Sequence, residues 1–188
     1  MLQKNILEVI DRIIKNPFSG FLIKAFFFYI IWQLFYDQVL YPDGRLDDLL
    51  ALTTVFLSKN ILNALGWIVY THGRIIWIEG TQGLEIVNGC NALKLMVLYS
   101  GFIICLGNGL GKKLKFLTFG IVTIYMLNII RIVLFNLVIL YFKDYWNIIH
   151  EFSPFIFFYP FILWVWYRWA LVGIKDRDIR SLYESSLS

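Results

Sequence analysis

Four long apolar stretches constrain the fold of this chain more than any other feature. They lie at about 21–39, 90–106, 116–142 and 152–171. The apolar core of a bilayer is about 30 Å thick and takes roughly 20 helical residues to cross, which these stretches approach or exceed. With 59% hydrophobic and 16% charged residues, the chain is also unlike a soluble domain. The sequence therefore predicts an all-α polytopic membrane protein with about four transmembrane helices.

A fifth apolar stretch, 46–70, is interrupted by polar residues. Asp47 and Asp48 stand at its start, and Lys59 and Asn63 divide its interior into pieces too short to span. Apolar segments too short to span a bilayer are typical of interfacial or re-entrant helices. We predict such a helix on the outer face of the membrane.

Residues 73–89 follow this helix and have β-strand character. Two short apolar runs, 75–78 and 84–87, flank a Gly-Thr-Gln-Gly turn signal. Short β-patterned runs separated by a glycine-containing turn are typical of a hairpin. We predict a short β-hairpin that lies on the outer membrane face.

The distribution of charge fixes the direction of the spans. Lys and Arg near span ends favour the cytoplasmic side. With four spans, the basic segments 4–15, 112–115 and 175–180 all lie on one side, whereas five spans would place one of them outside. Both termini are therefore predicted to be cytoplasmic, and residues 41–89 extracytoplasmic.

The same assignment divides the chain into three regions. Residues 1–16 are predicted to form a cytoplasmic amphipathic segment on the membrane surface, with a solvated leader as the alternative. We expect this segment to be retained, because it lacks the apolar core of a cleavable signal peptide. Residues 17–172 form the membrane domain, and residues 173–188 form a cytoplasmic tail.

Composition excludes several classes of function. The net charge is +4, but the basic residues lack the clustering that a nucleic-acid-binding face needs, so no nucleic-acid partner is expected. Two cysteines are too few for a disulfide scaffold or a four-cysteine metal site, and no other ligand spacing is present. We therefore expect no metal and no cofactor.

Arg131 lies inside the third apolar stretch. A charge there costs roughly 2.5–3.5 kcal/mol on insertion scales, so such residues mark functional sites by default. Asn128 precedes it by three residues, on the same helical face. The alternative is a structural ion pair with a carboxylate such as Glu85 or Glu151.

Cys90 follows Asn88 and Gly89 and opens the second apolar stretch. The start of a helix stabilises an anion such as a thiolate, and Lys94, one turn deeper, would act in the same direction. The alternative is a small apolar filler. Cys105, about 22 Å further along the same helix, is predicted to be structural.

His150 stands at the outer edge of the fourth stretch. Its ordinary pKa near 6.5 suits general acid or base chemistry, and His72 is the competing imidazole. The predicted topology brings Cys90, Arg131 and His150 from three consecutive spans to one side of the membrane at similar depth.

The segments VNGCNALKL, NIIRIVLFN and HEFSPF around these three residues resemble the exosortase and archaeosortase family of membrane sorting enzymes. The resemblance covers roughly residues 46–161, and it is greatest to the compact F-type exosortases of Bacteroidetes. It implies Cys90, Arg131 and His150 as catalytic residues. We also predict supporting roles for Asn88, Asn91, Lys94 and Asn128.

The resemblance implies a cysteine-dependent protease and transpeptidase in the bacterial inner membrane, with an extracytoplasmic active site. Such an enzyme cleaves membrane-anchored proteins at a C-terminal sorting signal through a thioester and transfers the product to an acceptor. The sequence does not determine which catalytic task Arg131 performs and which His150 performs. Two alternatives also fit them: a non-enzymatic membrane transport or envelope-assembly protein, and a thiol-dependent lipid or acyl transferase.

Overall fold

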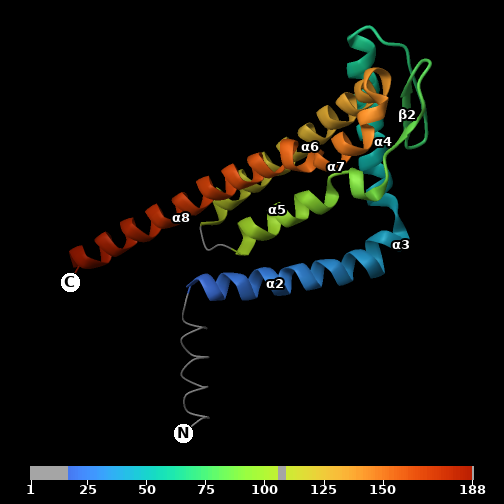
Figure 1. The fold of residues 1–188 in the computed structure, drawn as a ribbon. Coiled ribbons are helices and arrows are strands. Elements are labelled where there is room, and N and C mark those ends of the chain that lie inside the picture. The colour runs from blue at the N-terminus through green and yellow to red at the C-terminus, as the bar shows by residue number, and fades with distance from the viewer. Residues whose placement is uncertain (1–16, 106–108, 188) are drawn as a thin grey trace.

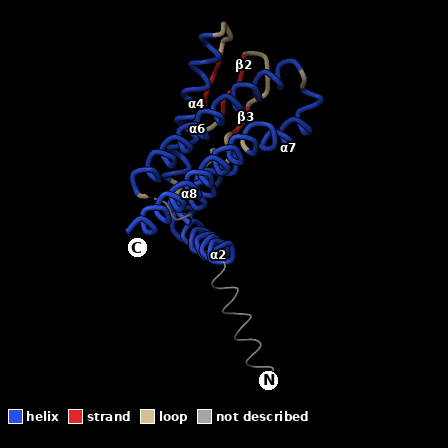
Figure 2. The backbone as a smooth tube through the Cα atoms, turned by 90° about the vertical axis from the view of Figure 1, so that its left-hand side faces the viewer, coloured by secondary structure: helices blue, strands red, loops and turns tan. Residues whose placement is uncertain are grey.

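The structure is a computed structural model that describes residues 17–105 and 109–187. It is mostly helical, with a small antiparallel sheet at one end (Figure 1 and Figure 2). Three helical segments in the described part are long and apolar enough to cross a membrane: Ser19–Asp43, Leu110–Tyr141 and Lys143–Gly173. The prediction of a helical polytopic membrane protein is confirmed. The predicted amphipathic segment 1–16 lies outside the described residues.

The first membrane segment is longer than the predicted span 21–39. It consists of α2 (Pro17–Phe35), a π-helical turn (Tyr36–Leu40) and α3 (Tyr41–Asp43). Gly44 follows with a φ of +67°, a left-handed conformation that ends the segment and leads into the next helix.

The predicted second span is wrong in its length. Helix α5 (Leu93–Cys105) has 13 residues, or about 20 Å, which is less than a bilayer core. It begins three residues after Cys90 because Ala92 has a φ of +66°, which an α-helix cannot contain. The described chain therefore has three long apolar segments and one shorter apolar helix.

The third span is α6 (Leu110–Tyr141), and the fourth is broken into α7 (Trp146–Phe157) and α8 (Tyr159–Leu187). A short 3-10 turn, Lys143–Tyr145, joins α6 to α7. The break falls at Phe158, two residues before Pro160. Pro160 has no N–H to bond the carbonyl four residues earlier, so the helix stops before it, and Pro160 then occupies the first turn of α8. The backbone of α8 continues to residue 187, so the predicted tail from 173 begins as helix.

Helix α4 (Arg45–Ala64) is not among the candidate spans, as predicted for the stretch 46–70. It packs against α6, where Thr53 Oγ1 lies 2.6 Å from the Tyr125 hydroxyl. The helix ends earlier than predicted. Gly66 has a φ of +100°, and the chain continues as a strand from Val69.

The predicted hairpin is present and has one more strand than predicted. The strands β1 (Val69–His72), β2 (Ile75–Ile78) and β3 (Leu84–Glu85) form an antiparallel sheet in the order β1-β2-β3. A tight turn that starts at Gly73 joins β1 to β2, and the φ of +54° at this glycine suits a two-residue hairpin loop. The first strand was missed because its apolar residues continue the preceding apolar stretch.

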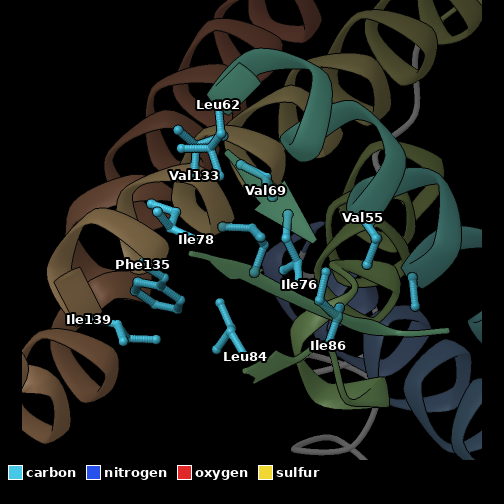
Figure 3. Packing of buried hydrophobic residues seen from close by; sticks show 12 residues of the cluster. Val55, Leu62, Val69, Ile76, Ile78, Leu84, Ile86, Val133, Phe135 and Ile139 are labelled. Carbon is cyan, nitrogen blue, oxygen red and sulfur yellow. The ribbon is translucent and has the colours of Figure 1, made fainter. Parts of the chain in front are cut away.

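Two clusters of buried residues hold these elements together. The first lies between the inner face of the sheet, α4 and α6 (Figure 3), and includes Ile76, Ile86, Leu62, Val133 and Phe135. The second lies among α5, α6 and α8, and includes Tyr99, Ile103, Ile124, Val165 and Trp169. The segment between β3 and α5 begins in the first cluster and ends in the second, so each cluster holds one end of it.

Candidate active site

The structure brings Cys90 and His150 into contact. Cys90 ends a 3-10 turn, Asn88–Cys90, between β3 and α5, and His150 lies in α7. The Cys90 Sγ is 3.8 Å from His150 Nε2, within the range of a hydrogen bond to sulfur. Cys90 is half-buried and His150 is exposed. A thiol and an imidazole at this separation can exchange a proton.

Two aromatic rings hold the His150 imidazole in place. Its centroid lies 5.2 Å from the Trp146 ring and 5.4 Å from the Phe135 ring. Trp146 is one helical turn before His150 in α7, and Phe135 comes from α6. The orientation of the imidazole is therefore fixed by two different helices.

Arg131 is buried beside this pair, with 5% of its surface exposed. Its guanidinium carbon lies 5.1 Å from the Phe135 ring and 5.3 Å from the Phe158 ring. The guanidinium interacts electrostatically with Cys90 and with His150. The third predicted residue therefore belongs to the same site.

The alternative interpretation of Arg131 was a structural ion pair, and the described part of the structure contains no such pair. Among the residues whose side chains are described, no carboxylate lies within ion-pair distance of its guanidinium. Glu85 and Glu151, the two candidates, are exposed. The Arg131 Nε also lacks a hydrogen-bond partner in the described part of the chain. The charge of Arg131 is therefore available to the site.

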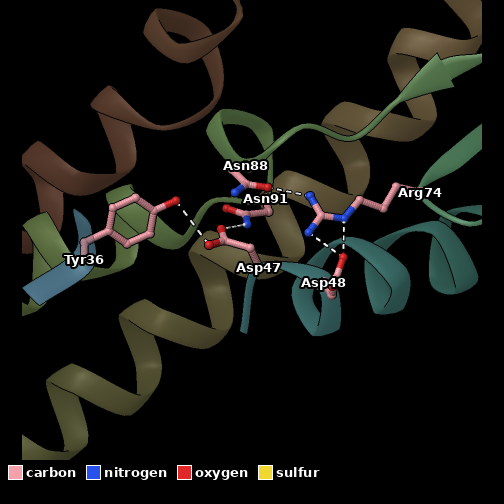
Figure 4. Close-up of polar contacts among 6 residues, drawn as sticks. All are labelled: Tyr36, Asp47, Asp48, Arg74, Asn88 and Asn91. Atoms are coloured by element: carbon pink, nitrogen blue, oxygen red, sulfur yellow. Dashed lines mark hydrogen bonds and ion pairs between the residues drawn. The ribbon is translucent and has the colours of Figure 1, made fainter. Parts of the chain in front are cut away.

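The turn that carries Cys90 is held from both sides by consecutive carboxylates of α4 (Figure 4). On one side, Asp48 pairs with Arg74 at 2.5 Å, and Arg74 donates a hydrogen bond to Asn88. On the other side, Asp47 accepts a hydrogen bond from Asn91 Nδ2. The two asparagines that flank Cys90 are thus both tied to the first turn of α4.

The contact between Asp47 and Asn91 is entirely buried. Both residues have 0% exposure, and Asp47 also accepts a hydrogen bond of 3.1 Å from the Tyr36 hydroxyl. The Asn91 Oδ1 accepts a hydrogen bond of 3.1 Å from the Leu93 N–H, so this amide caps the start of α5. Asp47 therefore fixes both the turn that carries Cys90 and the point where α5 begins.

The remaining predicted residues take different positions. Lys94 lies on the α2 side of α5, with its Nζ 5.5 Å from the centre of the Tyr36 ring. Lys94 does not lie one helical turn below Cys90, as predicted, because the helix begins only at Leu93. Asn128 is completely buried, and neither atom of its amide has a partner within the described residues.

The other cysteine and the other histidine lie elsewhere in the fold. Cys105 is at the opposite end of α5 from the turn that carries Cys90, and His72 is an exposed residue at the end of β1. Both are free of the contacts that join Cys90 to His150 in the described structure.

Sequence reasoning did not identify Tyr36, Asp47, Asp48 and Arg74 as part of the site. The available signal was the pair of asparagines around Cys90, because buried amides need partners. In the sequence, Asp47 and Asp48 stand out only as charges at the start of an apolar stretch.

Comparison with known proteins identifies the family to which the chain belongs. The family model for transmembrane exosortases of the EpsH type matches residues 18–167. Archaeosortase A of Haloferax volcanii is 30% identical over 95 residues, which cover 48% of this chain and 31% of that protein. The chain thus matches about a third of the length of this relative. No solved structure matches. The family match spans every residue of the candidate site, and the chain belongs to the transmembrane exosortase family.

Proposed function

We propose that this protein is a membrane-embedded, cysteine-dependent sorting protease and transpeptidase. The observation that carries the proposal is the contact of 3.8 Å between Cys90 and His150 beside a buried arginine. Family membership supports the same chemistry. The substrates would be membrane-anchored proteins with a C-terminal sorting signal.

The contacts support different roles for His150 and Arg131 in the reaction of Cys90. His150 Nε2 takes the proton of the thiol, and the thiolate attacks the carbonyl carbon of the scissile peptide bond. When the C–N bond breaks, the same imidazole returns the proton to the leaving amine. This leaves a thioester between Cys90 and the N-terminal part of the substrate.

The second half of the reaction resolves the thioester. An acceptor amine attacks the thioester carbonyl and gives up a proton to His150, and the Cys90 sulfur leaves and recovers a proton from the imidazole. Arg131 remains charged throughout, because a guanidinium does not deprotonate in proteins. Its role is to stabilise the thiolate and the oxyanion that forms in both halves.

We propose a location in the bacterial inner membrane, with this site on the extracytoplasmic side. The support is the charge pattern, since three lysines of the segment 112–115 lie at the start of α6, and Arg131 lies in the other half of that helix.

The test compares the two cysteines of one chain in the native host. We expect Cys90→Ala and Cys90→Ser to abolish cleavage, so that a precursor protein that retains its C-terminal apolar segment accumulates in the membrane. Cys105→Ala serves as the matched control and should process normally at equal protein level. Equal loss in both cysteine variants would indicate a packing role for Cys90.

The nature of the intermediate separates the proposed function from its alternatives. Rapid denaturation during turnover, followed by hydroxylamine release, should recover a peptide from Cys90. Release of a fatty acyl group would instead establish an acyl transferase. Absence of any precursor in Cys90→Ala cells would favour a non-enzymatic membrane role.

A further inference from the structure

The sheet has an open edge that leads directly to Cys90. Strand β3 is the last strand of the sheet, and among the described strands it pairs with β2 alone. The Ile86 N–H donates a hydrogen bond of 3.0 Å to the Arg74 carbonyl, so the backbone groups of Ile86 face β2. Because successive residues of a strand direct these groups to opposite sides, those of Glu85 and Val87 face away from β2.

Three of these outward backbone groups have no hydrogen-bond partner in the described part of the chain. The Val87 carbonyl accepts a hydrogen bond of 2.8 Å from the Cys90 N–H. Within the described residues, the Val87 N–H and both backbone groups of Glu85 make no hydrogen bond outside the sheet. Glu85 is exposed and Val87 is 48% exposed, so a second chain can reach these groups.

The open edge adjoins a cavity of about 360 Å³. Its walls include Glu85, Val87, Asn88 and Gly89, which are consecutive along the edge except for the buried Ile86, together with Tyr41 and Arg74. Asn88 and Arg74 are joined by a hydrogen bond, so this wall is preformed. The cavity therefore ends at the residue that precedes Cys90.

We propose that the substrate binds as an extended peptide on the open edge of β3, and that one of its side chains enters this cavity. The proposal rests on the proposed function, since it names the binding mode of the chain that Cys90 cleaves. An extended peptide offers carbonyl and N–H groups at the two-residue spacing of Glu85 and Val87. Backbone pairing holds the peptide without regard to sequence, and the cavity selects the side chain.

The occupant is a peptide and not a second copy of the protein, because the edge is short. Only residues 85 and 87 present outward groups before the chain turns at Asn88. Pairing of two such edges would give few hydrogen bonds, whereas a peptide bound there is also placed beside the nucleophile. A short edge strand is typical of proteins that avoid self-association.

The test is a pair of substitutions at one position. Val87 has a φ of −73° and a ψ of 163°, which proline adopts without strain. Val87→Pro deletes the outward N–H, whereas Val87→Ala keeps it and shortens the side chain. The probe is the precursor that accumulates in Cys90→Ala cells, with its cleavage measured in membranes at several precursor levels.

We expect Val87→Pro to raise KM about tenfold, near the upper range for loss of one hydrogen bond, and to do so at least fivefold more than Val87→Ala. The single-turnover rate at saturating precursor should change less than KM. Equal effects of the two substitutions would overturn the proposal, as would an unchanged KM in Val87→Pro. Thioester formation by the unmodified protein reports on the proposed function separately, so the two failures are distinguishable.

A photo-crosslinking amino acid at position 85 gives a second measurement. It should capture the precursor in membranes of the Cys90→Ala variant. Capture of a second copy of the protein in place of the precursor would overturn the proposal and make this edge a dimer contact.

Discussion

Asp47 gives the most exacting test of how the turn with Cys90 is held. It is completely buried and accepts hydrogen bonds from the Tyr36 hydroxyl and from Asn91 Nδ2. Asp47→Ala leaves both donors buried without an acceptor. Each unsatisfied donor costs about 1–3 kcal/mol, so the folded protein should lose roughly 2–6 kcal/mol of stability if both stay buried.

The structural effect of Asp47→Ala should be larger at the candidate active site than elsewhere in the fold. Without Asp47, Asn91 loses the contact that orients its amide, and with it the cap on the Leu93 N–H, worth about 1 kcal/mol. The turn then relaxes, and the Cys90 Sγ moves from His150. A shift of about 1 Å in a reacting group can lower the rate about 100-fold. We expect a loss of that order in Asp47→Ala.

Asp47→Asn separates the charge of this residue from its hydrogen bonds. The new Oδ1 can accept from Asn91, and the new Nδ2 can donate to the Tyr36 hydroxyl oxygen. We expect the loss of stability and of rate to be smaller than in Asp47→Ala. The matched control is Asp43→Asn, which removes an ion pair of 2.9 Å with Arg45, a side chain that is 88% exposed. Exposed pairs contribute little, so this variant should behave like the unmodified protein.

The assay is the rate of maleimide labelling of Cys90 relative to Cys105 in the same chain. It is combined with precursor cleavage at equal membrane level. In Asp47→Ala the labelling ratio should change together with the cleavage rate, because the thiol has left His150 and Arg131. A variant with lower thermal stability but an unchanged labelling ratio and normal cleavage would refute the reasoning, since Asp47 would then only stabilise the fold.

Three further predictions concern other parts of the molecule. Arg131→Lys should keep membrane insertion but lose most cleavage, because an ammonium cannot reproduce the planar donor array, and full processing by this variant would contradict its catalytic role. Gly120→Ala should destabilise the protein by about 1–3 kcal/mol in thermal unfolding, since the added Cβ would lie 2.0 Å from the buried Tyr99 ring, whereas Gly111→Ala, with nothing within 4 Å, should not. A cysteine placed at Thr81 should be labelled by an impermeant maleimide only from outside the cell, and labelling only from the cytoplasm would reverse the topology.

Hydropathy located all four apolar segments, but it placed the start of the second one at Cys90, whereas α5 begins at Leu93. The positions of α2 and α6 follow approximately from apolar length, which is a local property of the sequence. The start of α5 depends on Asn91, whose amide is oriented by Asp47, 44 residues earlier. An apolar run shows where a helix can exist, and it does not show which tertiary contact caps it.

The same distinction applies to the candidate site. The order of the spans was enough to predict that Cys90, Arg131 and His150 meet, because each lies near the same end of consecutive membrane segments. The roles of Asp48 and Arg74 were not predictable, since their pairing joins α4 to the turn before β2. That contact depends on the register of the sheet, and the first strand of the sheet was itself hidden in an apolar stretch.

The environment of Arg131 explains how a buried cation can remain available to the site. A carboxylate partner would stabilise the guanidinium but would also cancel its field at Cys90. The rings of Phe135 and Phe158 contribute about 0.5–2 kcal/mol each by cation–π attraction, which offsets much of the roughly 2.5–3.5 kcal/mol that a charge costs at membrane depth. Neither ring carries a charge, so the field of Arg131 still acts on the sulfur. Phe158 is also the residue at which α7 and α8 separate, so the helix break caused by Pro160 contributes one of the two rings that hold this arginine.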